Sequence, residues 1–578
     1  MRSLPSLPTL PALLEHIRPT TPGKAITGLQ VAIVLIAGCA HALAVAWPFD
    51  VFLEYGRPVW WLQLLALFVL ALQLERCAGS NSPVRSAALL GWLFATALQC
   101  ATWWWLFISL HTYGGLASPL AVIAIVGLAA FLALYYALAC GAFMLLASVN
   151  RAGRAMVFGA LWLLAELARV VLFTGFPWGE GGYAQLDGPF ADLAKLLGVH
   201  GLTLLGAVLA AALAGLLLRP RRLAFSVVAA ALLLAVMTSR AVKIDLVGAS
   251  IFSSAQPATG AAGGGPFTVT LLQGNIAQDE KFQGGKGIPD ALRWYGEQLG
   301  SAGSSLVVTP ETAIPLLPRQ LPEGYADALV KRFSGPASNQ TGTAALIGIP
   351  LGDSQEGYTN SVIGLKPAAP GENPPDGQAY RYDKHHLVPF GEFVHPLFKW
   401  YLSLVNIPLA DFKSGAVNQP SFDWQGQRLA PNICYEDLFG EELAARFRDP
   451  EGSPTIFVNI SNIAWFGNTI AIDQHLNISR MRALEFERPM IRATNTGATA
   501  IIDHRGEVAQ MLPRHTRATL TGEVQGRTGN TPYAAWAARF GLWPWWLLIA
   551  GVATGAVAAR MRRAGQRNRA GSEQAHRP

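Results

Sequence analysis

Charged side chains are scarce in this chain of 578 residues. Asp, Glu, Lys and Arg together make up 14% of it, against about 25% in an ordinary soluble domain. Hydrophobic residues make up 51% of the chain. This composition excludes an entirely soluble protein and predicts several membrane spans. The length also exceeds that of one ordinary domain, so a second, more polar domain is expected.

Cysteine is scarce as well, with five residues in all. Cys39, Cys77, Cys100 and Cys140 lie in or beside apolar stretches, where cysteine behaves as a small hydrophobic side chain. Cys434 stands alone in the polar region, so it has no neighbour there for a disulfide and no paired spacing for a metal. Gly-x-Ser-x-Gly and His-Glu-x-x-His motifs are also missing, which disfavours a serine hydrolase and a zinc peptidase.

Eight stretches are long and apolar enough to cross a bilayer, which takes about 20 residues. Seven precede the polar region, at 26–46, 59–75, 86–110, 119–147, 155–174, 198–218 and 222–239, and the eighth lies at 540–559. The expected parts are a cytoplasmic N-terminus (1–24), a bundle of seven spans (25–240), a linker (241–266), a catalytic domain (267–530), a final span (531–560) and a basic cytoplasmic tail (561–578).

The basic residues indicate how the chain is oriented. Region 240–530 contains 24 Lys and Arg against 28 Asp and Glu, so the net charge of +7 belongs to the membrane-associated parts. A nucleic-acid partner is therefore not indicated. Arginines gather in alternate loops, at 76–85, 151–154 and 219–222, and in the tail. Under the positive-inside rule these segments are cytoplasmic and region 240–530 lies on the outer side.

The polar region alternates short β-branched runs with helical patterns. Strands are expected at 267–275, 305–310, 344–350, 429–435, 455–461, 490–495 and 499–503, and helices at 288–301, 323–334, 440–447 and 470–487. This alternation is typical of a layered α/β domain. The region is long enough to bury a large core.

Three residues could carry out chemistry. Glu311 comes at the end of a predicted strand, Cys434 comes directly after a strand pattern, and Lys384 lies with Glu392 around an apolar turn. A lone cysteine is more often an inert buried side chain, and a single Glu or Lys is more often solvated. Taken together, the three form a coherent site. A carboxylate can accept the thiol proton, a thiolate is a good nucleophile, and an ammonium can stabilise the oxyanion that forms on attack.

The polar region resembles the nitrilase, or carbon–nitrogen hydrolase, superfamily, whose sites use Glu, Lys and Cys in that chain order. The whole chain resembles the apolipoprotein N-acyltransferase family of the bacterial inner membrane. The stretches that carry the resemblance are TGFPW…GYAQLDGP (174–189), LLQGNIAQ (271–278), TPETAIP (309–315), YDKHHLVPFGEFV (382–394), NICYED (432–437), ISNIAWFG (460–467), SRMRALEFERP (479–489) and RATNTGATA (492–500).

The resemblance implies an αββα sandwich on a membrane bundle, with a role for each matched residue. Glu311 would be the general base, Lys384 the oxyanion-stabilising cation and Cys434 the nucleophile. The supporting residues would be Glu392, Tyr435 and Glu436, the last two shaping the pocket and orienting Lys384. Aromatic side chains would contact lipid or substrate at Trp465, Phe466, Phe390, Phe282 and Trp178. The family commonly has Asp where Ile463 stands, which leaves the effect of this replacement open.

The implied reaction completes bacterial lipoprotein maturation through a Cys434 thioester. A membrane glycerophospholipid would donate the acyl chain, and the N-terminal S-diacylglyceryl-cysteine of an apolipoprotein would accept it. No metal or organic cofactor is implied. Two alternatives remain open. A membrane-tethered amidase would need one span rather than eight. A transporter or sensor with an inactive α/β module predicts that all three site residues are dispensable.

Overall fold

Most of the predicted spans are present as long helices. The computed structural model describes residues 25–146, 151–218, 255–258, 264–334, 342–367, 379–394 and 412–575. Seven helices in these ranges are long and apolar enough to cross a membrane. They are α2 (Gly28–Val45), α3 (Trp60–Cys77), α4 (Pro83–Trp103), α5 (Ser118–Leu146), α6 (Arg151–Val171), α7 (Ala194–Leu217) and α15 (Trp543–Ala575). The expected span at 222–239 and most of the expected linker lie outside the described residues.

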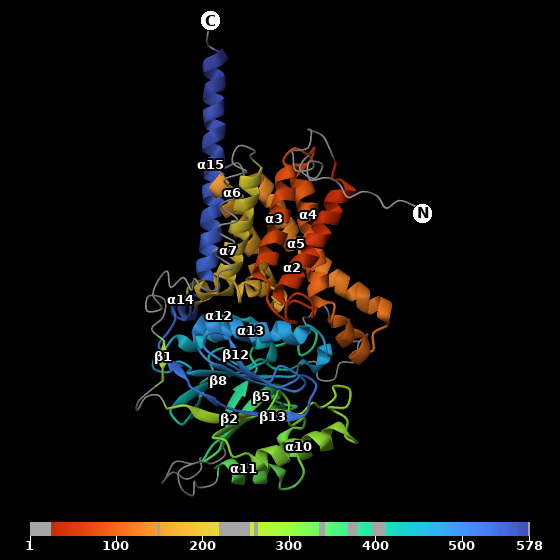
Figure 1. The fold of residues 1–578 in the computed structure, drawn as a ribbon, viewed down its shortest axis with the longest axis vertical. Coiled ribbons are helices and arrows are strands. Elements are labelled where there is room, and N and C mark those ends of the chain that lie inside the picture. The colour runs from red at the N-terminus through yellow and green to blue at the C-terminus, as the bar shows by residue number, and fades with distance from the viewer. Residues whose placement is uncertain are drawn as a thin grey trace.

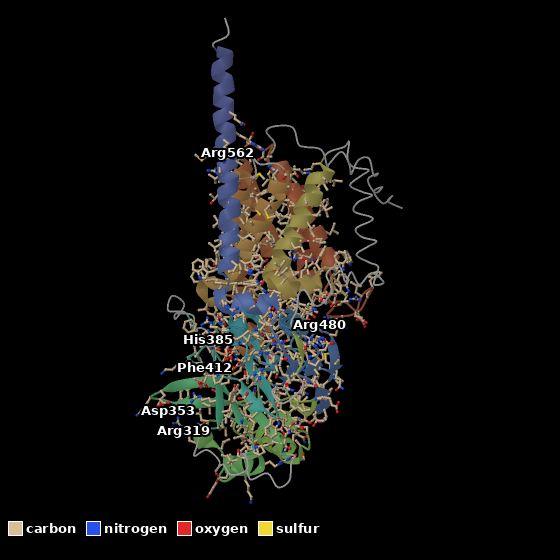
Figure 2. The ribbon with its side chains drawn as sticks, turned by 90° about the vertical axis from the view of Figure 1, so that its left-hand side faces the viewer. Arg319, Asp353, His385, Phe412, Arg480 and Arg562 are labelled. Carbon is tan, nitrogen blue, oxygen red and sulfur yellow. The ribbon has the colours of Figure 1, made fainter. Side chains whose placement is uncertain are left out.

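The seven helices form one bundle, with α15 running along its side and the polar domain at one end (Figure 1). Basic side chains lie at the other end. Arg154 pairs there with Glu75 at 2.6 Å, Arg560 donates to the carbonyl of Leu145, and Arg562 lies far from the polar domain in Figure 2. The chain is therefore a multi-pass membrane protein with its basic ends grouped on one side.

A buried ion pair in α6 holds the loop between α6 and α7 through hydrogen bonds. Arg169 and Glu166, one helical turn apart in α6, are paired at 3.1 Å and both 1% exposed. The Arg169 guanidinium also donates to the carbonyls of Phe176 and Trp178, at 3.1 and 2.7 Å. Charges inside a membrane protein are costly unless paired, so this pair fixes the loop that carries Trp178.

The polar domain is built on two six-stranded sheets. In space the first has the order β13-β2-β3-β4-β5-β6, and the second has the order β12-β11-β10-β9-β8-β7. The strands are β2 (Phe267–Gln273), β3 (Leu306–Val308), β4 (Ala344–Asp353), β5 (Gly357–Leu365), β6 (Tyr380–Asp383), β7 (Phe422–Trp424), β8 (Gln427–Ile433), β9 (Ile456–Ser461), β10 (Met490–Thr494), β11 (Ala500–Ile502), β12 (Val508–Met511) and β13 (Ala518–Val524). A short pair, β1 (Gln256–Pro257) and β14 (Arg527–Thr528), lies apart from both sheets.

Parallel pairing forms the centre of each sheet, through β2–β3–β4 and through β8–β9–β10. Strands buried on both faces read as nearly continuous apolar runs, and β3 (Leu-Val-Val) and β9 (Ile-Phe-Val-Asn-Ile-Ser) do so. Side chains such as Val269, Val308, Ile433 and Val458 fill the space between the two sheets.

Helices cover the outer face of each sheet. α10 (Gly287–Ser301) and α11 (Tyr325–Ser334) pack on β2–β4, while α12 (Gly440–Ala444) and α13 (Ala471–Phe486) pack on β8–β10. The predicted αββα sandwich beside a membrane bundle is thus confirmed. The range expected for the final span, 531–560, covers two helices. α14 (Pro532–Phe540) ends at Gly541, where φ is +52°, and of the two only α15 is long and apolar enough to cross a membrane.

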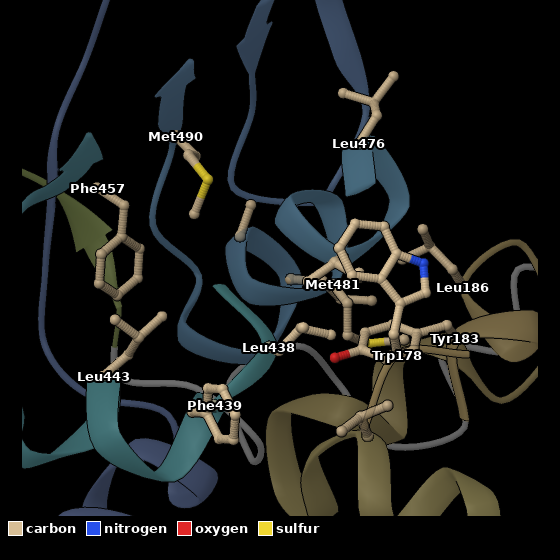
Figure 3. Close-up of a cluster of buried hydrophobic side chains, with 14 of the residues drawn as sticks. Trp178, Tyr183, Leu186, Leu438, Phe439, Leu443, Phe457, Leu476, Met481 and Met490 are labelled. Atoms are coloured by element: carbon tan, nitrogen blue, oxygen red, sulfur yellow. The ribbon is translucent and has the colours of Figure 1, made fainter. Parts of the chain in front are cut away.

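The sandwich meets the bundle through α13. Every residue of α13 except Arg480 is buried, because β-strands lie on one side and membrane helices on the other. One apolar cluster spans the junction (Figure 3), with Trp178 and Tyr183 from the bundle beside Leu438 and Met481 from the sandwich. A shared core of this kind fixes the two parts relative to each other.

Candidate active site

The three candidate residues each follow the end of a strand. Glu311 lies three residues after β3, Lys384 directly after β6 and Cys434 directly after β8. Cys434 has φ +53°, so the chain turns sharply there from the strand into a 3₁₀ turn at Cys434–Leu438. A left-handed conformation at a residue other than glycine is strained and is often found at functional sites. The Cys434 side chain is half-buried and packs against the core between the two sheets.

A network of hydrogen bonds joins Glu311 to Lys384. The Lys384 ammonium lies 3.3 Å from Glu311 Oε1 and 2.8 Å from Glu392 Oε2. Asn360 donates from Nδ2 to Oε1 of both carboxylates, at 2.6 and 2.8 Å. The backbone N–H of Asn462 donates to Glu311 Oε2 at 2.8 Å. Buried charges need such partners, and here Lys384 is 1% exposed and Glu311 7%.

These contacts set the protonation state of the site. Burial would raise the pKa of Glu311, but Lys384, Lys281 and the amide donors hold it below its ordinary value. Burial disfavours the Lys384 ammonium, yet Glu311 and Glu392 keep its pKa above the ordinary value. Burial and the charge of Glu311 raise the pKa of the Cys434 thiol to about 12, and Lys384 offsets part of that rise. The resting site is therefore a carboxylate, an ammonium and a neutral thiol.

This combination can supply a base, a cation and a nucleophile. The ionised Glu311 can take the thiol proton at the moment of attack, so the thiol need not be ionised beforehand. Lys384 is fixed and charged, and a cation placed in advance stabilises developing negative charge.

Glu436 braces the turn that presents Cys434. Its carboxylate accepts hydrogen bonds from the backbone N–H groups of Ile433 and His385, at 2.5 and 2.6 Å, and from the Tyr382 hydroxyl at 2.8 Å. It therefore orients Lys384 through the backbone beside it, whereas Glu392 contacts the ammonium directly.

Tyr435 links the sandwich to the bundle. Its hydroxyl donates to the carbonyl of Gly175 at 3.0 Å, and its ring lies 6.3 Å from that of Phe176. The adjacent His386 has Nε2 2.7 Å from the carbonyl oxygen of Thr174. These contacts turn the Tyr435 side chain toward the α6–α7 loop.

Three of the predicted aromatic residues lie where the sandwich faces the bundle. Phe466 contacts Trp105 with ring centroids 4.2 Å apart and Trp178 at 6.0 Å. Trp178 is 3% exposed and donates from Nε1 to Gln474 at 2.8 Å. Trp465 meets Tyr113 edge to face at 5.8 Å.

The other two aromatic residues lie in loops of the sandwich. Phe282 is partly buried, with the Lys281 ammonium 5.9 Å from its ring. Phe390 has φ +62° in a turn where its N–H donates to the carbonyl of Phe393 at 2.7 Å. The aromatic segment that follows, 395–411, lies outside the described residues.

Sequence reasoning missed several polar groups at the site. Lys281 is 2% exposed, and its ammonium donates to the Glu311 carbonyl at 3.0 Å and to Thr312 Oγ1 at 2.6 Å. Burial lowers its pKa to about 8. Asn360 and Asn462 were missed too. Lys281 and Asn462 lie in or next to the matched stretches, whereas Asn360 has no local signal because it reaches the site only through pairing of β5 with β6.

Ile463 is 1% exposed and packs in the apolar cluster at the junction. In this turn the backbone N–H of Asn462 donates to Glu311. Because this donor is a backbone group, replacing the side chain at 463 would leave it in place. Within the described ranges, no group of three or more His, Cys, Asp and Glu side chains could hold a metal ion.

Similarity to known proteins covers both parts of the chain. Residues 37–212 match the family model described as the apolipoprotein N-acyltransferase N-terminal domain, and residues 268–533 match that of carbon-nitrogen hydrolase. The apolipoprotein N-acyltransferase of Verminephrobacter eiseniae is 55% identical over 89% of this chain and 93% of the relative. That of Ralstonia nicotianae is 43% identical over 82% and 85%, and that of Bordetella bronchiseptica is 42% identical over 94% and 98%.

Proposed function

Because this chain belongs to the apolipoprotein N-acyltransferase family, we propose that it moves a fatty acyl chain from a membrane glycerophospholipid to an apolipoprotein. The acceptor is the α-amino group of the N-terminal S-diacylglyceryl-cysteine, and the step is the last in lipoprotein maturation. The observation that carries the proposal is the meeting of Glu311, Lys384 and Cys434 at strand ends near the bundle. Figure 2 places His385, the neighbour of Lys384, on that side of the sandwich.

The first half-reaction forms a thioester. Cys434 Sγ attacks the ester carbonyl while Glu311 accepts the thiol proton. Lys384 stabilises the oxyanion of the tetrahedral intermediate. When the C–O bond breaks, the proton passes from Glu311 to the departing oxygen, and a lysophospholipid leaves.

The second half-reaction reverses these proton transfers. The α-amino group attacks the thioester carbonyl and its proton passes to Glu311. The C–S bond breaks, an amide forms, and the Cys434 thiol is restored by the proton held on Glu311. Glu311 thus acts first as a base and then as an acid in each half-reaction.

Water competes with the amine for the thioester, so a transferase must keep it away. The burial of Lys384 and Glu311 and the contacts of Tyr435 and His386 with the α6–α7 loop support such exclusion. The acyl donor is a component of the bilayer, which accounts for a site next to membrane helices.

The proposed location is the inner membrane, with the sandwich on the periplasmic side. The position of the arginines supports this orientation. Arg154, Arg560 and Arg562 lie at the bundle end away from the sandwich, and basic ends remain cytoplasmic.

The test is a search for the acyl adduct. Purified protein in lipid nanodiscs is exposed to phospholipid with a labelled acyl chain, and intact mass and peptide mapping locate the label. We expect one acyl group on Cys434, released as an N-acylated product when a diacylglyceryl peptide is added. Cys434→Ala should carry no label. Cys140→Ala, which removes a buried thiol within the bundle, is the matched control and should label normally.

The alternatives predict different results. Hydrolysis of small amides without any acyl adduct would favour a tethered amidase. A transporter or sensor would be favoured if Glu311→Ala, Lys384→Ala and Cys434→Ala all complemented loss of the wild-type gene.

A further inference from the structure

His475 lies directly behind the candidate nucleophile. It belongs to α13, is 0% exposed, and has Nε2 3.1 Å from the carbonyl oxygen of Cys434. Its ring stacks on that of Trp178, with centroids 5.5 Å apart and an interplanar angle of 27°. The imidazole is therefore wedged between the α6–α7 loop of the bundle and the turn that presents Cys434.

The partner of the other ring nitrogen fixes the tautomer. Arg492 Nη2 lies 2.9 Å from Nδ1, and a guanidinium can only donate. Nδ1 must therefore accept, and the ring proton resides on Nε2 and points at the Cys434 carbonyl. Burial, aided by the charge of Arg492, holds the pKa of His475 well below its ordinary value, so the ring stays neutral.

Both nitrogens are thus occupied, which excludes His475 as a general base. A base needs a free lone pair within reach of the proton it takes. Here one lone pair is used by Arg492, and the other nitrogen carries a proton that is engaged with a backbone oxygen.

The Cys434 carbonyl needs such a donor. The register of β8 with β9 ends at Ile433 and Ile460, so the next carbonyl has left the ladder. Asn459 Nδ2 is a longer contact at 3.5 Å. A buried carbonyl without a hydrogen-bond partner is unfavourable. The Cys434 backbone, at φ +53°, is also strained, so surrounding contacts must hold its conformation.

We propose that His475 is a positioning residue whose Nε2–H donates to the Cys434 carbonyl and locks the turn that aims the thiol. The peptide between Cys434 and Tyr435 is planar, so fixing its oxygen also fixes the orientation of the bonds on either side. Trp178 holds the imidazole from the bundle side. This role rests on the proposed function, since it serves the same nucleophile.

The test measures the thiol itself. The rate at which iodoacetamide alkylates Cys434 is followed against pH by site-resolved mass spectrometry, alongside acyl transfer. In His475→Phe the donor is lost, and we expect the alkylation profile to shift and kcat to fall about tenfold, with KM for lipid unchanged. His475→Gln can donate to the carbonyl and accept from Arg492, so it should restore most of the rate.

The matched control is His41→Phe, because His41 is equally buried in α2 and has no hydrogen-bond partner in the described part of the chain. It should leave the alkylation profile as in wild type. If His475→Phe does not fold, His475→Asn replaces it, because its shorter side chain cannot reach the carbonyl.

The proposal is overturned by a wild-type profile in His475→Phe, or by equal rates in the Gln and the Phe or Asn variants. Alkylation needs no acyl donor, so these outcomes are separable from a failure of the proposed function. That failure would appear as wild-type protein that alkylates at Cys434 but never acquires an acyl group.

Discussion

Replacing Asn360 with leucine should raise the pH at which the site becomes active. Asn360 Nδ2 donates at 2.6 Å to Glu311 and at 2.8 Å to Glu392, both inside the sandwich. A hydrogen bond to a charged group contributes about 1.5–3 kcal/mol. One pKa unit corresponds to about 1.4 kcal/mol. Losing the bond to Glu311 should therefore raise the pKa of that carboxyl by about one to two units.

The direction of this pH shift follows from the protonation state of Glu311 that the proposed reaction requires. Glu311, the proposed base, can accept a proton only when ionised. Its pKa lies below the ordinary value, so the carboxylate form persists to a lower pH than it would in an exposed glutamate. The rate of acylation should rise with pH through that pKa and then level off. In Asn360→Leu the carboxyl is protonated at higher pH, and the acid limb of the profile moves up by the same one to two units.

The assay is the single-turnover rate of Cys434 acylation from labelled phospholipid as a function of pH. Asn477→Leu is the matched control, because Asn477 is also a buried amide and donates to the Gly56 carbonyl at 2.8 Å, away from the carboxylates. It should lower stability without moving the acid limb. An acid limb in Asn360→Leu that coincides with wild type, in protein that remains folded, would refute the assignment of Glu311 as the base.

Two further substitutions test the supports of the site. Ile433 and His385 donate to different oxygens of Glu436, so Glu436→Gln turns an amide N–H toward one of these two donors. The change should lower the free energy of unfolding by about 1–3 kcal/mol, measured as a drop in Tm, with loss of acylation. Unchanged Tm would contradict the bracing role. Asp187→Asn removes the charge of the partly exposed ion pairs that Asp187 makes with Arg480 at 2.7 Å and Arg57 at 3.8 Å, and should cost at most about 1 kcal/mol, a difference that high salt abolishes. A larger loss that persists in salt would show that these pairs matter to docking of the sandwich.

The membrane helices and central strands could be predicted because their signals are local. Long apolar runs identified the helices up to α7, and β-branched runs such as Leu306–Val308 identified the strands buried on both faces. The strands at the edges were missed, and so was β5, which lies between β4 and β6. β13 alternates exposed and half-buried residues, and β12 is mostly exposed, so neither has the continuous apolar pattern of a central strand. Their pairing is set by tertiary contacts with β2 and β11.

The candidate site could also be predicted from the sequence only in part. Glu311, Lys384 and Cys434 each follow a strand within a distinctive stretch, so their types and order pointed to one chemistry. The groups that hold them do not have such a signature. The N–H of Asn462 is a backbone group, and Asn360 and His475 reach the site from a strand and a helix far away in sequence. Their roles depend on register and packing, which no short pattern encodes.

The bundle and the sandwich share a continuous line of contacts that ends at Cys434, the proposed nucleophile. Arg169, paired with Glu166 inside α6, donates to the Trp178 carbonyl, the Trp178 ring stacks on His475, and His475 reaches the Cys434 carbonyl. A soluble hydrolase that needed only a membrane anchor would have no use for this arrangement, since one span would hold it at the surface. Each link is buried and directional, so displacing the α6–α7 loop must disturb the turn at Cys434. Under the proposed function, the membrane helices therefore belong to the scaffold that orients the Cys434 thiol, which gives a physical reason for combining them with the sandwich in one chain.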